Sequence, residues 1–311
     1  EKEFAKMSRA EREAEWRDMI AVLKGEKTED TETNSDTSAA AEASSAAAHT
    51  DSASEDTEAK SGNTAEEKAY FFTQGFNAAG LRYLQNNLPM NGASFLPLGG
   101  FGASSKLHTR YDATLTGGQP VGVALVYGDF SIGATGTVTA VDGKKVVAFG
   151  HSFMHKGNVN YFMTDADVIG TIAGQSNGVK IANIGSVIGR VNQDRETGIA
   201  GVLGTFPTSV PVQIHVKDNA LGTEETFGAQ IAYDEDFLPV LVPGIAYAAM
   251  GKTSDTIGEA TANLKFTIRT TAGEDGKIER SNMYYTASDV GQASVGELAQ
   301  VMTLLCQNAE E

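Results

Sequence analysis

The stretch SIGATGTVTAVDGKKVVAFGHSFMH, residues 131–155, gives the clearest indication of the fold of this chain. Its first half alternates threonine, valine and small residues and predicts a β-strand. Val141-Asp142-Gly143 supplies turn residues, and the apolar, β-branched run at 145–149 predicts the return strand. The stretch therefore predicts a β-hairpin that ends at Gly150 and His151.

His151 is the candidate catalytic residue. A strand end is a rigid place from which to present a side chain, and a preceding glycine lets the backbone bend sharply there. The alternative interpretation is a turn histidine that bonds only to the backbone. His215 lies in the alternating run VPVQIHV and is expected at the surface, on the face opposite its valines and isoleucine.

Composition excludes several function classes. The chain has 311 residues, is 41% hydrophobic and can bury a full core. Its formal charge of −16 argues against binding nucleic acid or anionic lipid through general electrostatics. Its 34 glycines and seven prolines favour a turn-rich β protein. No run is long and apolar enough to span a membrane, so no membrane-spanning segment is expected.

Changes of composition along the chain predict five regions. They are an amphipathic helix at 1–24, a disordered acidic linker at 25–66, a small α/β lead-in at 67–105, a β domain at 106–250, and the start of a second β unit with a C-terminal helix at 251–311. Ser294 and Glu297 predict a capping box for that last helix. Because the sequence opens without methionine and stops soon after a helix, we expect an internal piece of a longer protein.

No metal or cofactor is expected. Cys306 is the only cysteine, which excludes an internal disulfide and a thiolate zinc cluster. His151 and His155 are four residues apart, but they lie in a β context and no H-E-x-x-H motif accompanies them. The glycines at 99, 100 and 102 match neither phosphate-binding motif.

A nucleophile is harder to find. Residues 174–178, GQSNG, match the G-x-S-x-G elbow of α/β-hydrolases, but the next segment predicts a strand where that elbow needs a helix. The pentapeptide is therefore interpreted as a hairpin turn. Several carboxylates could orient the second ring nitrogen of a catalytic histidine. The candidates, among which the sequence does not choose, are Asp129, Asp165, Asp167 and Asp194.

Several segments in this order resemble the SpoIVB-type serine peptidases. They are residues 138–152 with their VVAFGHSF ending, GRVNQDR at 189–195, GIAGVLG at 198–204, and the strand ending PVQIHV. The resemblance implies a mainly β, chymotrypsin-like β-barrel peptidase domain with flanking helices. It also implies a serine endopeptidase that acts on a protein or peptide substrate in a bacterial cell envelope or a secreted setting.

The family's G-H histidine falls on His151, which the resemblance makes the general base. The family's nucleophile motif, G-x-S-G-x-P, is absent, and its nearest approach is AKSG at 59–62, in the linker. The resemblance therefore implies that this chain holds the histidine half of the peptidase. An upstream segment of the same protein would carry the nucleophile, as in one branch of the family. The alternative is a non-catalytic envelope scaffold or binding protein that retains the peptidase fold.

Overall fold

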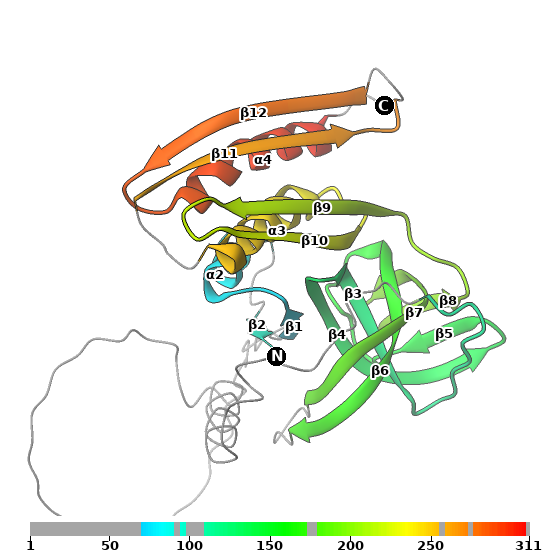
Figure 1. Ribbon diagram of the computed structural model, residues 1–311. Coiled ribbons are helices and arrows are strands. Elements are labelled where there is room, and N and C mark those ends of the chain that lie inside the picture. The colour runs from blue at the N-terminus through cyan, green and yellow to red at the C-terminus, as the bar shows by residue number, and fades with distance from the viewer. Residues whose placement is uncertain are drawn as a thin grey trace, which may run out of the picture. The chain divides into compact units, whose positions relative to one another are not determined.

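The computed structural model of the chain describes residues 70–89, 94–97, 109–172, 179–254, 259–272 and 276–308. The expected helix at 1–24, the linker at 25–66 and His108 lie outside these residues. The described part is mainly β, as expected, with one large sheet, a separate two-stranded sheet and three helices (Figure 1). None of the described helices is both long and apolar enough to cross a membrane.

Six antiparallel strands form a closed ring of pairings. Each strand pairs with two others in the order β3–β4–β5–β8–β7–β6 and back to β3. The strands are β3 (Pro120–Gly128), β4 (Ser131–Asp142), β5 (Lys145–Ala148), β6 (Gly157–Ile172), β7 (Val179–Arg195) and β8 (Gly198–Leu203). The ring leaves these six strands without a free edge along the paired segments.

The hairpin predicted from the sequence is confirmed as β4 and β5. Asp142 pairs with Lys145, and Gly143 in the turn has a φ of 58°, a value that glycine adopts without strain. The return strand ends at Ala148, one residue before the predicted end, because Phe149 has a φ of 76°. A residue in the left-handed region cannot continue an extended strand.

β3 has no solvent-facing side, because it is buried at every position from Val121 to Tyr127. It is enclosed because it pairs with β4, β6 and β10 along its length. β6 and β7 are long strands, and the pairing between them shifts register at several bulges. Bulges let long strands bend around a core without ending.

Further strands extend the sheet from both sides of the ring. β1 (Tyr70–Gln74) pairs with β4 and, in parallel, with β2 (Ser94–Pro97). β10 (Thr223–Ala232) pairs with β3 and with the edge strand β9 (Ser209–Asp218). Between β1 and β2 lies α2 (Ala78–Asn87), where a helix was expected.

The sequence did not predict the central helix α3 (Leu238–Thr253). Its residues are apolar on nearly every side and include Pro243, so they show no helical period. The helix is buried because α2, α4 and the β9–β10 hairpin all pack against it. α4 (Val290–Gln307) in turn contacts the separate two-stranded sheet of β11 (Ala260–Arg269) and β12 (Lys277–Thr286).

The expected capping box of the last helix was also wrong. α4 begins at Val290, and its N-cap is Asp289, whose Oδ1 accepts a hydrogen bond from the Gln292 amide at 3.0 Å. Ser294 is buried inside the helix and donates to the Gly291 carbonyl at 2.9 Å. An aspartate side chain caps a helix as well as a serine does, so both residue types were plausible starts.

Candidate functional site

His151 lies just after the end of β5, in a loop that reaches Gly157 and leads into β6. Phe149 and Gly150 have φ values of 76° and 81°, and His155 and Gly157 have 57° and 78°. Left-handed backbone is strained for phenylalanine and histidine and persists only where the surroundings hold it. His151 itself is exposed, as a general base must be when its substrate approaches.

The loop's aromatic side chains hold it against the core. The ring of Phe153 is buried and lies 5.3 Å from that of Phe71 and 6.1 Å from that of Tyr161, centroid to centroid. Phe149 packs where Gly136 leaves room, since a Cβ at position 136 would lie 2.3 Å from the Phe149 ring. Edge-to-face and tilted ring contacts of this kind contribute beyond simple area burial.

The ring of His151 is oriented by a backbone carbonyl. Its Nδ1 lies 2.6 Å from the Ser152 carbonyl oxygen. Because a carbonyl oxygen can only accept, Nδ1 must carry the proton of the neutral ring. Nε2 is then the unprotonated nitrogen that can accept a proton from a reacting group. Among the described residues, no carboxylate hydrogen bonds to this ring.

Asp194, one of the four candidate acids, is buried beside this loop. Its carboxylate has 0% exposure and accepts hydrogen bonds from the loop's backbone. Oδ1 accepts from the Phe153 amide at 2.7 Å, and Oδ2 accepts from the amides of Met154 at 2.8 Å and Lys156 at 3.3 Å. Charge-assisted bonds from several amides satisfy a buried carboxylate without a cation. Asp194 is therefore an anchor of the loop that carries His151.

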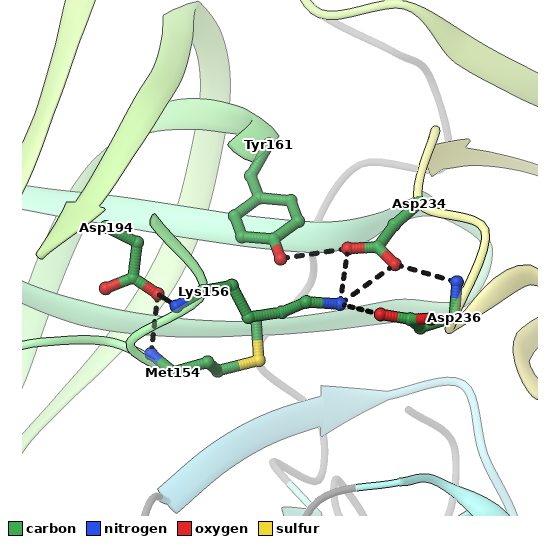
Figure 2. Close-up of polar contacts among 6 residues, drawn as sticks. All are labelled: Met154, Lys156, Tyr161, Asp194, Asp234 and Asp236. Atoms are coloured by element: carbon green, nitrogen blue, oxygen red, sulfur yellow. Dashed lines mark hydrogen bonds and ion pairs between the residues drawn. The ribbon is translucent and has the colours of Figure 1, made fainter. Parts of the chain in front are cut away.

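A second carboxylate holds the same loop from the opposite direction (Figure 2). Lys156 Nζ lies 3.1 Å from both oxygens of Asp234 and 2.7 Å from Asp236 Oδ2. The ammonium also lies 4.1 Å from the centre of the Phe237 ring, within the range of a cation–π contact. The loop is thereby tied to the turn that precedes α3.

Tyr161 completes this polar cluster. Its hydroxyl donates to Asp234 Oδ2 at 3.1 Å (Figure 2). Burial raises the pKa of the Tyr161 phenol far above its usual range, and the nearby Asp234 carboxylate raises this pKa further. The phenol therefore stays protonated and acts only as a hydrogen-bond donor to that carboxylate.

The other candidate acids serve separate contacts. Asp129 Oδ2 accepts from the Gly228 amide at 2.7 Å, which joins the β3–β4 turn to β10. Asp165 Oδ2 lies 3.1 Å from Arg110 in a half-exposed ion pair. Asp167 is exposed on β6. The structure brings none of these three carboxylates to the ring of His151.

The other histidines and the serine motifs show no contact with the His151 ring among the described residues. His155 is exposed in the same loop. His215 is exposed on β9, as predicted, with Nε2 3.2 Å from Glu224 Oε1. Residues 174–178 and 59–62 lie outside the described residues. The segment that follows 174–178 is the strand β7, as predicted, which does not fit a nucleophile elbow.

Sequence reasoning missed Lys156, Tyr161, Asp234 and Asp236. No motif links them, because Lys156 and Asp234 are 78 positions apart. Among the described residues, no group of histidine, cysteine and carboxylate side chains could hold a metal ion. No protein-family model, curated protein or solved structure gave a significant match to the chain.

Proposed function

We propose that this chain carries the histidine-bearing part of a serine endopeptidase of the SpoIVB type. The observation that carries the proposal is the presentation of His151: an exposed ring in the loop after β5, with Nδ1 bonded to a carbonyl and no hydrogen bond to Nε2 from the described residues. The nucleophile and its acid belong to another segment of the same protein, and the substrate is a protein or peptide in the bacterial envelope or outside the cell. A chymotrypsin-like barrel is the proposed architecture, and the closed ring of strand pairings supports it.

In this mechanism His151 acts first as a base and then as an acid. Nε2 removes the proton from a serine hydroxyl as its oxygen attacks the scissile carbonyl carbon. The imidazolium then gives this proton to the leaving amine as the peptide C–N bond breaks. General acid–base catalysis of this kind contributes roughly 10²–10⁴ in rate.

The test substitutes His151 in the intact natural protein. His151→Ala is expected to abolish proteolysis, including self-cleavage, while the melting temperature stays near that of the parent, because an exposed ring contributes little to the core. His155→Ala and His215→Ala are the controls and should keep most of the activity. Proteolysis that survives in the His151 variant would refute the proposal.

A second candidate function is a non-catalytic scaffold or binding protein. Two observations favour it: no described carboxylate contacts the His151 ring, and the outer face of the β11–β12 hairpin exposes Met283 and Tyr285, with 72% and 67% of their surface accessible. Serine-directed fluorophosphonates separate the two functions. The peptidase requires labelling of the intact protein at a serine outside residues 1–311, whereas a scaffold would remain unlabelled. Labelling of Ser176 would instead point to the elbow motif.

A further inference from the structure

One peptide group joins His151 to Asp194. The carbonyl of the Ser152–Phe153 peptide accepts the hydrogen bond from His151 Nδ1 at 2.6 Å, and the N–H of the same peptide donates to Asp194 Oδ1 at 2.7 Å. In a trans peptide the C=O and N–H point in opposite directions. The imidazole, the peptide and the carboxylate therefore form a single chain of two hydrogen bonds.

We propose that Asp194 is a positioning residue for His151 and acts through the Ser152–Phe153 peptide. This inference rests on the proposed role of His151 as a base. The carboxylate charge polarises the peptide and makes its carbonyl a stronger acceptor, because hydrogen bonds in a chain reinforce one another. A stronger acceptor holds the proton on Nδ1 and keeps Nε2 free to take a proton.

Asp194 cannot exchange this role for direct contact with the ring. Both carboxylate oxygens are engaged, since Oδ2 also accepts from the amides of Met154 and Lys156. The residue is fully buried, and its backbone pairs with Gly157 across β6 and with Ile199 across β8. It therefore orients the ring through one intervening peptide, and is distinct from the acid of the proposed triad, which contacts the histidine directly.

The effect of Asp194 on His151 depends on the rigidity of the loop that carries both His151 and Lys156. Lys156 is bound through its backbone to Asp194 and through its side chain to Asp234, so the loop is held from two directions (Figure 2). Removing the Asp194 charge leaves the Lys156–Asp234 contact in place. The effect of such a substitution should consequently concentrate on the residues between His151 and Met154.

The first test reads the tautomer of His151 by long-range ¹H–¹⁵N NMR on the 311-residue chain. The wild-type ring is expected as Nδ1–H, and Asp194→Asn should convert it to a mixture of the two tautomers. Asp129→Asn is the matched control, because Asp129 also accepts a hydrogen bond from a backbone amide, that of Gly228 on β10. This substitution should leave the tautomer of His151 unchanged. An Nε2–H ring in the wild type overturns the proposal without needing any variant. An unchanged tautomer in folded Asp194→Asn overturns it equally.

The second test measures turnover in the intact protein. Asp194→Asn is expected to lower kcat by about 10²-fold, the usual effect of a misplaced catalytic group, with little change in KM. An equal loss in Asp129→Asn, or a loss confined to KM, would count against positioning. If His151→Ala retains activity, the proposed function fails, while the tautomer measurement still decides whether Asp194 orients the ring.

Discussion

Lys156 Nζ lies 3.1 Å from both carboxylate oxygens of Asp234, which joins the loop of His151 to the turn before α3. The side chains are 26% and 13% exposed, so the pair is largely removed from water. Asp234 also accepts from the Tyr161 hydroxyl and from the Asp236 amide. This one carboxylate therefore connects β6, the loop of His151 and the turn before α3.

Substitution of Asp234 should destabilise the protein. Asp234→Asn keeps the shape but leaves the ammonium of Lys156 with the exposed Asp236 as its one charged partner among the described residues. The expected loss lies between that of an exposed pair and that of a buried one, about 2 kcal/mol in the free energy of unfolding. Urea unfolding followed by circular dichroism measures it.

The control for this substitution is Glu279→Gln. Glu279 pairs with Lys277 at 3.0 Å, but both side chains are about half exposed on the β11–β12 hairpin. The expected loss is much smaller than that of Asp234→Asn, because water screens exposed pairs. Equal losses in the two variants would show that the Lys156–Asp234 ion pair stabilises the fold no more than an exposed ion pair does.

Gly189 on β7 should not tolerate a side chain. A Cβ there would lie 2.4 Å from the Val202 carbonyl oxygen and 3.1 Å from the Leu203 Cα, and both are backbone atoms of β8. Gly189→Ala should destabilise the fold by about 1–3 kcal/mol, the range for overpacked cores. Gly170→Ala on β6 is the matched control, since no atom lies within 4 Å of its added Cβ. A neutral Gly189→Ala in thermal unfolding would mean that the β7–β8 register differs.

The start of α4 can be tested through its two rival caps. Asp289→Ala removes the acceptor for the Gln292 amide and for the Tyr247 hydroxyl, and should lower stability by about 1–2 kcal/mol. Ser294→Ala removes a bond to the Gly291 carbonyl and a weak contact with the Met250 sulfur, and should lower stability by less than that. Chemical denaturation of both variants checks the order. A larger loss for Ser294→Ala would restore it as the cap.

Stability should fall in strong alkali, partly through Tyr247. Burial, and then the hydrogen bond to Asp289, raise the pKa of Tyr247 to about 12, above the value of about 10 in an unfolded chain. The folded state keeps this proton where the unfolded state loses it, so the contribution is full below about pH 10 and is lost as the pH rises toward about 12.

The matched variant for this effect is Tyr247→Phe, which has no phenol to titrate. Its free energy of unfolding should fall less steeply than that of the parent between about pH 10 and pH 12, since the other tyrosines titrate in both proteins. Urea titrations across this interval provide the slopes. Parallel slopes for the two proteins would show that Tyr247 titrates alike in the folded and unfolded chains.

Several features of the large sheet could be predicted from local sequence patterns. The β4–β5 hairpin could be predicted because its turn residues and β-branched strands lie next to one another in the sequence. The exposed side of β9 followed from strict alternation around His215. The position of His151 just after a strand followed from the strand pattern and from Gly150. Each of these features depends on a few consecutive residues.

Local sequence patterns could not predict the elements that are buried on all sides. β3 and α3 are enclosed by neighbours from several parts of the chain, so neither shows the one-sided periodicity by which an element is recognised. The cap at Asp289 likewise competed with an equally plausible Ser294. In the structure Asp289 is the cap, and it also accepts from the Tyr247 hydroxyl, which comes from another helix.

For the candidate site, too, the sequence determined some features and the tertiary structure decided others. The sequence by itself determined that His151 follows the β4–β5 hairpin at a glycine turn and that Asp194 belongs to a short set of possible acids. Only the tertiary structure decided that Asp194 binds the loop's amides and that Lys156 meets Asp234. Strand and turn preferences arise between adjacent residues, whereas these contacts join residues 41 and 78 positions apart. Such pairs are far apart in the sequence and are brought together only by the tertiary fold.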